Sequence, residues 1–337
     1  MIKEEVKALW KLCFDDSEDF IEMYFRLRYN NETSIAIESG EEVIAALQMI
    51  PYPMTFCGKA IQTSYISGAC THPDYRGNGV MRELLSQAFV RMLRSDVAVS
   101  TLIPGEPWLF DYYARLGYAP VFGYSSREIP ANKAPRTSSI SVRSTVDYEQ
   151  AVYLYLNKKM EKHPCCIQHT EADFKVILED LALENNAVYI ATRKEQVVGV
   201  AVAYQTGNEL QLPALFTDTE EIENELLYKI QKMTGCKRLT VLTPPAHAAK
   251  LHLLGMARII DIRRILQLYA AAYPSDEMNI ELTDEQLSTN NGYYYLCSGK
   301  CMYNKERLPG THLKLSIGEL SEKILAPLQP YMSLMLD

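Results

Sequence analysis

The start of the chain switches from helical to strand periodicity. Residues 2–14 carry apolar side chains at helical spacing and predict a first helix. Ser17 is placed to cap a second helix, in which apolar residues between 20 and 25 share one face. Alternating or continuous apolar runs then predict strands at residues 34–37, 43–49 and 61–63. The pattern therefore opens with two helices followed by antiparallel strands.

Residues 65–85 form the stretch around which the rest of the pattern is organised. The apolar run at 65–70 predicts a strand, and from Gly79 onward apolar residues recur at helical spacing. Between them lies a turn that also contains Arg76 and Gly77. A glycine-rich turn that opens a helix leaves backbone N–H groups unpaired at the positive end of the helix dipole. This arrangement binds phosphate or pyrophosphate, because glycines let the anion approach the backbone.

Two common phosphate-binding patterns do not fit this turn. A Walker loop requires a Gly-Lys-Ser/Thr ending, which the turn lacks. The dinucleotide pattern G-x-G-x-x-G would require a third glycine at position 82, where the sequence has Arg82. What remains is the Arg-x-x-Gly of residues 76–79. An ordinary strand–turn–helix also produces this short pattern, so its interpretation depends on a second motif.

The second motif lies at residues 106–118, shortly after a strand predicted from the largely apolar run at 97–103. It is typical of a short helix that Gly117 closes at its C-terminal end. Within it, an aromatic residue, Tyr112, precedes the string Tyr-x-Arg-x-Gly-aromatic that begins at Tyr113. Either tyrosine could simply pack in the core, and we expect that one of them does.

In this order and at this spacing, the two motifs resemble the GNAT superfamily of N-acetyltransferases. The resemblance implies that acetyl-CoA is the co-substrate and that Tyr113 is the general acid that protonates the CoA thiolate, with Tyr112 structural. The implied cofactor-binding residues are Ala69, Cys70, Thr71, Arg76, Gly77, Asn78, Gly79, Val80, Met81, Trp108 and Leu109. A covalent intermediate on Cys70 is an alternative, but the resemblance argues for direct attack of the amine on the thioester.

The pattern restarts beyond a linker predicted at residues 129–139, which indicates an internal repeat. The repeated elements are helices near 147–161 and 171–184 and strands at 195–201 and 239–243. The repeat lacks the phosphate-binding turn. Where that turn would be, residues 215–221 carry acids instead of glycines and an arginine. Leu251 stands at the position that matches Tyr113. The second half is therefore predicted to be a degenerate GNAT fold without a CoA site.

The tail from about residue 275 is a third unit, small for an independent domain. Asn290-Asn291-Gly292 predicts a hairpin turn before a strand at 293–296, and a strand at 313–317 leads into a final helix. The predicted fold class is α/β (α+β), with two tandem GNAT folds, the second degenerate, and a small C-terminal α/β unit. The predicted domains are 1–130 (catalytic), 140–272 (degenerate) and 275–337.

This succession of units resembles the enhanced intracellular survival (Eis) family of bacterial acetyltransferases, whose tail is similar to a sterol-carrier-protein fold. The Eis branch tolerates a large aliphatic residue at the position of Met81, where most GNAT enzymes have Gly or Ala. The resemblance implies a homo-oligomer, a hexamer in that family, and the C-terminal α-carboxylate, here on Asp337, as the catalytic base. Apolar residues before Asp337 would anchor the terminus, and partial burial would raise the pKa of its carboxylate. Glu106 and Asp111 are alternative bases. The other interpretation is that the last residues form a strand that packs in the third unit, with a terminus that faces water.

Composition restricts the partners of this protein. Of its 337 residues, 47% are apolar and 23% are charged, as in an ordinary globular protein of two or three domains. A net charge of −8 argues against non-specific binding of nucleic acid. No apolar run is long enough to cross a bilayer, and the N-terminus lacks the apolar core of a signal peptide. These features predict a cytoplasmic protein without a membrane or nucleic-acid partner.

The cysteines follow no disulfide or metal pattern. Eight are scattered along the chain, which predicts reduced thiols. Residues 163–169 hold two histidines and two cysteines, but adjacent cysteines point in divergent directions, so we interpret them as a loop between helices and expect no metal. Cys297 and Cys301 are interpreted as strand residues.

The expected function is transfer of an acetyl group to an amine of a small molecule or peptide. One rival is a tandem GNAT-like transferase that uses aminoacyl-tRNA; it should lack the 76–81 loop and carry a basic surface, and neither applies here. The other is a non-catalytic acetyl-CoA sensor or scaffold. The sequence does not identify the acceptor, because all three units would contribute to its pocket.

Overall fold

The computed structural model describes residues 2–130, 139–236, 238–245 and 251–336. The first part forms α1 (Ile2–Cys13), α2 (Glu18–Leu27), β1 (Ser34–Ser39), β2 (Glu42–Phe56), β3 (Lys59–Thr71), η1 (Pro73–Tyr75), α3 (Val80–Arg94), β4 (Val99–Leu102), α4 (Pro107–Ala114) and β5 (Ala119–Ile129). The predicted cap on α2 is confirmed, since the Ser17 hydroxyl accepts a hydrogen bond from the Phe20 N–H at 3.2 Å. Up to α4, the order of helices and strands is the one that the sequence predicts, and β5 is a further strand that it does not predict.

The second part repeats a similar order of elements. It forms β6 (Ser141–Thr145), α5 (Gln150–Met160), β7 (Cys165–Ile167), α6 (Glu171–Leu183), β8 (Ala187–Arg193), β9 (Gln196–Thr206), β10 (Glu209–Thr217), α7 (Glu220–Thr234), β11 (Arg238–Thr243) and β12 (Leu251–Ile259). Within the predicted linker, β5 continues to Ile129, and residues 131–138 lie outside the described residues.

The tail forms a small sheet and two helices. Its elements are α8 (Ile262–Ala272), β13 (Met278–Thr283), η2 (Ser288–Asn290), β14 (Gly292–Cys297), β15 (Lys300–Asn304), β16 (Leu313–Ser316), α9 (Ile317–Leu325) and η3 (Ala326–Leu328). The strands of the tail are ordered β15-β14-β13-β16. Apolar residues of α8 and α9 join those of β2, β3, β4 and β12 in one core, so the tail packs directly on the first half.

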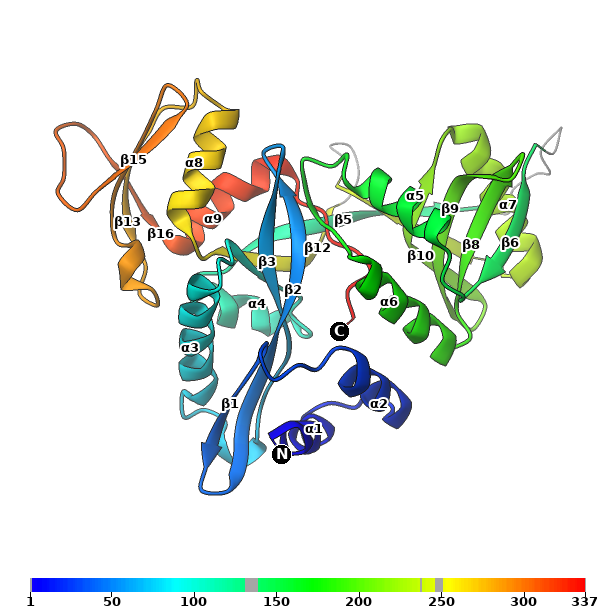
Figure 1. The fold of residues 1–337 in the computed structure, drawn as a ribbon, viewed down its shortest axis with the longest axis horizontal. Helices are drawn as coiled ribbons and strands as arrows, with labels where there is room; N and C mark the ends of the chain where they lie inside the picture. Colours follow the sequence, from blue (N-terminus) through cyan, green and yellow to red (C-terminus); the bar gives the residue numbers. More distant parts are fainter. Residues whose placement is uncertain (1, 131–138, 237, 246–250, 337) are drawn as a thin grey trace.

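One long sheet runs through both halves of the molecule (Figure 1). Over the described residues it has twelve strands, ordered β1-β2-β3-β4-β12-β5-β11-β10-β9-β8-β6, with β7 paired to β2. The halves are interleaved, because β12 lies between β4 and β5 and pairs antiparallel with both. The proposed domain boundaries thus fall within a continuous sheet, and they stay a prediction.

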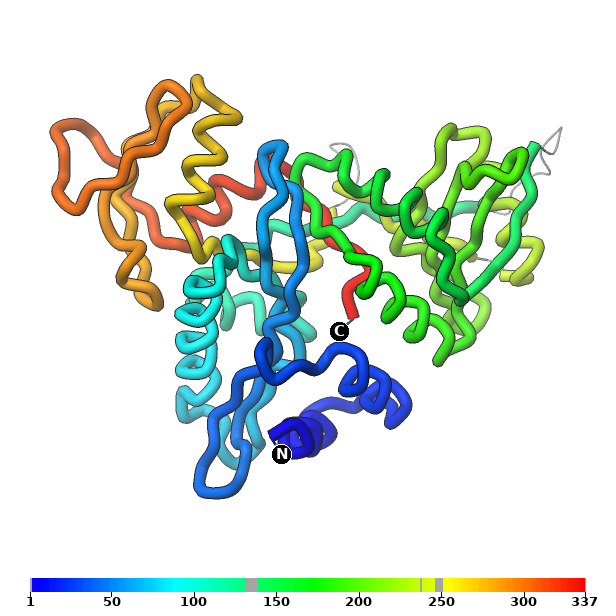
Figure 2. Tube along the Cα trace, in the orientation of Figure 1, coloured from blue at the N-terminus to red at the C-terminus, as the bar shows by residue number. Residues whose placement is uncertain are grey.

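The end of the chain lies between the two halves, where Figure 2 shows it entering the space between α2 and α6. The backbone of Tyr331 exchanges hydrogen bonds with β7 at 2.9 and 3.0 Å. Leu336, only 7% exposed, packs with apolar residues of α2 and α6. The apolar approach to the terminus is therefore buried, while Asp337 itself lies outside the described residues.

The first half contains longer strands than the sequence predicts. The two runs at 61–63 and 65–70 belong to one strand, β3, and β2 continues through Pro51 and Pro53. Between its pairings with β1 and β7, β2 has an open edge with which no described strand pairs. The Met49 N–H and the Pro53 carbonyl form their hydrogen bonds on this side, so the nitrogen atoms of both prolines face the open edge. The missing N–H groups of the prolines therefore remove no hydrogen bond between strands.

Four further expectations differ from the structure. Residues 163–169 are more than a loop, because Cys165 and Cys166 are buried in β7. The Asn-Asn-Gly of residues 290–292 is no hairpin turn, because a longer connection with a 3-10 turn joins β13 to β14. Leu251 begins a strand and so does not correspond to a helical Tyr113. The last residues form an isolated bridge with β7 instead of a strand.

Two searches of the described residues bear on partners. None of the helices in them is long and apolar enough to cross a membrane. In the same residues, no group of three or more His, Cys, Asp or Glu side chains could hold a metal ion. All eight cysteines are free thiols, as predicted, and Cys297 and Cys301 lie in β14 and β15.

Candidate functional site

Two parallel strands of the first half separate and leave a free edge. β3 and β4 pair only from Thr63 to Tyr65, opposite Val99 to Thr101. β3 continues to Thr71 beyond this pairing, and no described strand pairs with this edge of it. The backbone N–H and C=O groups around Ala69 are therefore available to an extended ligand.

A β-bulge sits at this separation. Ala46 pairs with Cys70 and Gln48 with Ser67, so β3 has one residue more than β2 in this interval. Gly68 lies in the bulge at φ +57°, and a Cβ there would lie 2.0 Å from the buried Trp10 ring. Only glycine suits both the backbone and the contact, and such a bulge re-aims the strand that follows.

The free edge leads into the glycine-rich turn before α3. Gly77 and Gly79 have φ near +80°, and a Cβ on either would meet no atom within 4 Å, so the turn faces open space. Gly79 is the N-cap of α3 and supplies no side-chain cap. The first N–H groups of this helix of 15 residues therefore remain for an anion, which the helix dipole also favours.

Arg76 and two cysteines meet where β3 ends. The Arg76 Nε donates to the Thr71 carbonyl at 3.0 Å, and its Nη2 lies 3.8 Å from the Cys13 Sγ at the end of α1. Interaction with the Cys70 thiol, and then with Arg76, lowers the pKa of Cys13 to about 6. The same contact with Cys13, together with burial, raises the pKa of Cys70 well above its ordinary value. A buried, protonated Cys70 does not suit the role of covalent nucleophile.

The tyrosines of α4 differ in their surroundings. Tyr113 is 7% exposed, and burial, followed by the effect of Tyr112, raises its pKa to about 12. Its ring lies 5.3 Å from that of the half-buried Tyr112 and 5.8 Å from that of Tyr118. No hydrogen bond of the Tyr113 hydroxyl is found among the described residues. The phenol is therefore kept protonated at neutral pH, as a proton donor requires.

The structure brings five of the sequence-predicted residues together in one apolar cluster. This cluster contains Tyr113 and, packed against it, Ala69, Val80, Met81 and Leu109. Trp108 is outside this cluster and 64% exposed. The Cys70 side chain packs instead with α1 and α2 on the other face, so only its backbone can join the edge of β3.

The corresponding position in the second half is closed to anions. α7 is capped by Thr219, whose hydroxyl accepts from the Ile222 N–H at 3.3 Å, and its first turn carries three glutamates. Asp218 precedes the cap and pairs with Lys159 at 2.8 Å. An acidic and already capped N-terminus repels phosphate, in contrast to α3.

Polar groups that sequence reasoning did not single out lie on the opposite face of β2, β3 and β4. Both amide atoms of Gln48 and the Thr101 Oγ1 are buried and have no hydrogen-bond partner among the described residues. They share this face with Ser67, which accepts a hydrogen bond from the Tyr24 hydroxyl at 2.7 Å. Buried polar groups of this kind are typical of places that hold water or a ligand. A polar residue within an apolar strand, such as Gln48, was the available signal.

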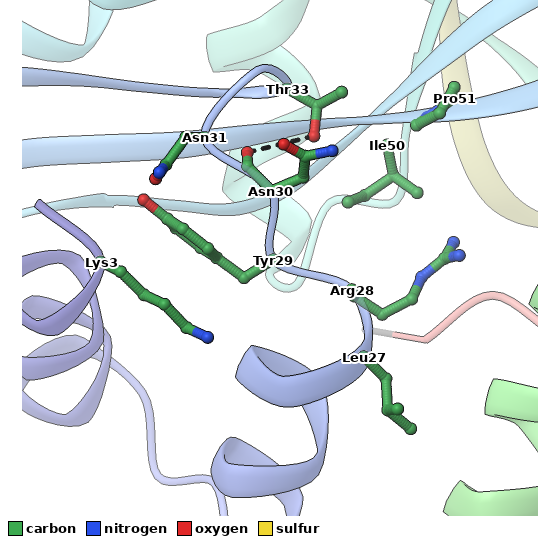
Figure 3. Close-up of a pocket in the computed structure, with 9 residues that line it drawn as sticks. All are labelled: Lys3, Leu27, Arg28, Tyr29, Asn30, Asn31, Thr33, Ile50 and Pro51. Carbon is green, nitrogen blue, oxygen red and sulfur yellow. Dashed lines mark hydrogen bonds between the residues drawn. The ribbon is translucent and has the colours of Figure 1, made fainter.

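Two cavities of about 490 Å³ lie beside this region. The first is at the open edge of β2 and is lined by residues such as Lys3, Arg28 and Ile50 (Figure 3). Arg28 there is held by Asp173 and by the Tyr52 hydroxyl. The second lies between the start of α4 and β12, and the exposed Glu106 lines it.

Residues 3–121 match the model of the acetyltransferase (GNAT) domain family. Among solved structures, the chain is similar to a GCN5-related N-acetyltransferase from Anabaena variabilis ATCC 29413, with a TM-score of 0.77 and 17% identity over 98% of this chain and 96% of that one. A GCN5-related N-acetyltransferase from Kribbella flavida has a TM-score of 0.74 and 18% identity over 99% of this chain and 95% of that one. Eis1 from Mycobacterium abscessus has a TM-score of 0.71 and 13% identity over 96% of this chain and 87% of that one. No curated protein matches the sequence.

These similarities establish a GNAT domain in the first half and a fold, with tandem GNAT-like halves, that extends over nearly the whole chain. At these identities the solved structures bear on the fold alone. The domain match favours acyl transfer as the chemistry.

Proposed function

We propose that this protein is an acetyl-CoA-dependent N-acetyltransferase of the Eis type, with its site in the first half. One observation carries the proposal: the free edge of β3 leads directly into the open, uncapped N-terminus of α3, beside Tyr113. An extended pantetheine arm fits such an edge, and a pyrophosphate fits such a helix end. The same element in the second half is capped and acidic, so one acetyl-CoA per chain is expected.

Binding would divide between backbone and side chains. The backbone from Ala69 to Thr71 would pair with the pantetheine amides, and the N–H groups of residues 76–81 would hold the pyrophosphate. Arg76 is exposed and would exchange its contact with Cys13 for the phosphates. Leu109 packs beside Tyr113 and would line the cofactor, with Trp108 at the surface next to it.

The chemistry requires an acid and a base. A neutral amine nitrogen attacks the thioester carbon, a C–N bond replaces the C–S bond, and the nitrogen gives up a proton to a base. Tyr113 would give its proton to the departing CoA thiolate. The α-carboxylate of Asp337 stays the proposed base, and Glu106 beside the second cavity is its nearest rival.

The acceptor is proposed to be an amine of a small molecule or peptide. The polar groups around Gln48 and Thr101 lie on the face opposite α3, where an acceptor would approach the thioester without crossing the cofactor. A homo-oligomer and a sterol-carrier-like tail stay predictions that rest on the resemblance to the Eis family.

The experiment combines binding with turnover. Calorimetry with acetyl-CoA should give one site per chain, and Gly79→Glu should abolish it, because a carboxylate would occupy the anion site. A thiol-release assay over polyamines, aminoglycosides, peptides and arylamines then separates a transferase from a sensor. Binding of acetyl-CoA without release of thiol for every amine would favour the sensor. Binding that survives Gly79→Glu would mean that acetyl-CoA does not bind at this loop.

A further inference from the structure

A fully buried ion pair lies at the junction of the first half and the tail. Arg258 of β12 and Asp284, directly after β13, both have side chains with 0% exposure. The Arg258 Nη2 lies 2.7 and 2.8 Å from the two carboxylate oxygens of Asp284. A buried charge is tolerated only when paired in this way, so each residue requires the other.

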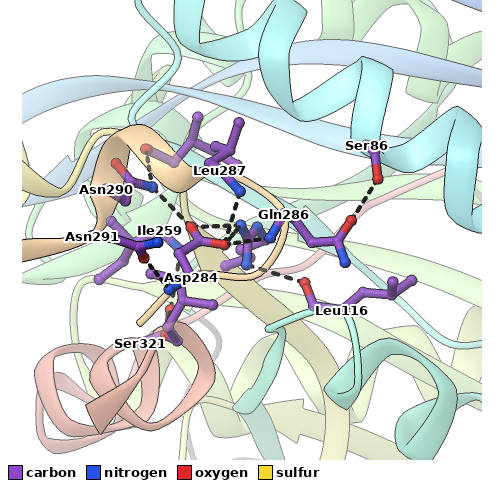
Figure 4. Close-up of polar contacts among 12 residues, drawn as sticks. Ser86, Leu116, Ile259, Asp284, Gln286, Leu287, Asn290, Asn291 and Ser321 are labelled. Atoms are coloured by element: carbon purple, nitrogen blue, oxygen red, sulfur yellow. Dashed lines mark hydrogen bonds and ion pairs between the residues drawn. The ribbon is translucent and has the colours of Figure 1, made fainter. Parts of the chain in front are cut away.

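The tail fixes the carboxylate of Asp284 from several sides (Figure 4). The N–H groups of Gln286 and Leu287 each donate to it at 3.0 Å, and the Asn290 side-chain amide donates at 2.9 Å. Asn291 accepts a hydrogen bond from the backbone N–H of Asp284. We call residues 284–291 the Asp284 turn. Because so many donors surround the carboxylate, the position of Arg258 is fixed as well.

Arg258 also contacts the residues directly after α4. Its Nη1 donates to the Leu116 carbonyl at 3.1 Å. The N–H of Leu116 in turn donates to the Tyr113 carbonyl at 2.9 Å. Gly117 leaves room for this contact, since a Cβ at its φ of +85° would lie 2.1 Å from the Arg258 Nη1. Two hydrogen bonds therefore connect the buried guanidinium to the residue proposed as the acid.

The same structure contacts α3, which begins at the glycine-rich turn. The Arg258 Cζ lies 4.5 Å from the centre of the Phe89 ring, and the Ser86 hydroxyl donates to the side chain of Gln286. Both helices that carry the proposed site are thus contacted by Arg258 of β12 or by the Asp284 turn of the tail. α4 has only eight residues, and a helix of this length depends on tertiary contacts for its position.

We propose that Arg258 and Asp284 are positioning residues for acetyl transfer, which set the place of Tyr113 through the end of α4. The role of Tyr113 rests on the proposed function, whereas the connection to α4 does not. The tail then contributes to the reaction through Asp284, whatever else it binds.

The test uses Arg258→Lys and Asp284→Asn in the full chain. An ammonium group cannot contact both Asp284 and the Leu116 carbonyl, and an asparagine keeps the shape of Asp284 without its charge. We expect a folded protein, an acetyl-CoA Kd within about 3-fold of wild type, and a kcat lower by roughly 10- to 100-fold, because small displacements of a catalytic group have effects of this size. Glu225→Gln is the matched control: Glu225 is 3% exposed, lies in α7 of the second half and pairs with Lys229 at 2.8 Å. It should lower Tm without lowering kcat.

A second measurement does not depend on turnover. With ¹³C-labelled tyrosine, the ring signal of Tyr113, assigned by its absence in Tyr113→Phe, should shift in both variants and stay in place in Glu225→Gln. If wild type acetylates no amine, the proposed function fails while this signal still decides the positioning role. If either single variant does not fold, Arg258→Met/Asp284→Leu removes both charges together and should show the same shift. An unchanged Tyr113 signal with an unchanged kcat in folded variants overturns the proposal.

Discussion

The assignment of Tyr113 as general acid can be tested by removing a single oxygen atom. Burial, and secondarily Tyr112, raises the pKa of Tyr113 to about 12, so at pH 7 only about one molecule in 10⁵ has lost the phenolic proton. The proton is therefore available for the CoA thiolate at any pH at which the enzyme would work. Tyr113→Phe removes this proton and retains the ring that packs in the apolar cluster.

The expected loss is chemical and not structural. Removal of a general acid lowers kcat by about 10²- to 10⁴-fold. The hydroxyl has no hydrogen bond among the described residues, so the change in unfolding free energy should be under about 1 kcal/mol. The acetyl-CoA Kd should change by less than about 3-fold, since the affinity would come mainly from the turn before α3. Tyr112→Phe is the matched control, because Tyr112 lies in the same helix, is half-buried and stacks edge-on against Tyr113.

The assay is CoA release between pH 6 and 10 with saturating acetyl-CoA. Because the pKa is raised, the proton is present throughout the range and is lost only as the pH rises toward about 12. The ratio of wild-type to Tyr113→Phe rates should therefore be constant over these pH values. A larger loss of kcat in Tyr112→Phe than in Tyr113→Phe would refute the assignment. So would a wild-type rate that declines as the pH rises to 9, if this decline is absent in Tyr113→Phe.

Three further predictions follow from single contacts. The rate of alkylation of Cys13 by iodoacetamide should be half-maximal near pH 6. Arg76→Ala or added acetyl-CoA should move this midpoint upward, because either change removes the guanidinium from the thiolate. An unchanged midpoint would contradict the contact between Arg76 and Cys13. Gly68→Ala should lower the free energy of unfolding, measured in urea, by about 2–4 kcal/mol. The reason is that the new Cβ would lie 2.0 Å from Trp10 at a residue with positive φ. A loss under about 1 kcal/mol would contradict the bulge. Leu336→Asp should cost a similar amount because it places a charge between α2 and α6, and a neutral effect would mean that the last residues do not pack there.

The features that the sequence predicts well are those set by neighbours along the chain. The turn before α3 is readable because glycines at positions 77 and 79 serve the local backbone, with φ near +80° at both. The cap at Ser17 and the end of α4 near Gly117 are readable for the same reason. Burial of the last apolar residues also follows from their composition, although their irregular path does not.

The features that the sequence does not predict depend on residues far apart. Two prolines in β2 suggest the end of a strand. They are compatible with a continuous strand because no described strand pairs with that edge of β2. Asn290 and Asn291 suggest a hairpin turn, but their side chains contact Asp284. The sequence shows Gln48 as a polar residue within an apolar strand, but it does not show that the side chain is buried without a partner among the described residues, because this depends on α2 and on three strands together.

The interleaved sheet explains why the motifs and the geometry of the site come from different parts of the chain. The two motifs lie between residues 69 and 118, yet β4 obtains one of its two neighbours from β12, which arises after residue 250. β12 also carries Arg258, so the strand that completes the sheet delivers the charge that contacts the end of α4. The pairing partner of that charge comes from the tail. The second half and the tail therefore supply the strand, the guanidinium and the carboxylate that lie next to the two motifs of the first half.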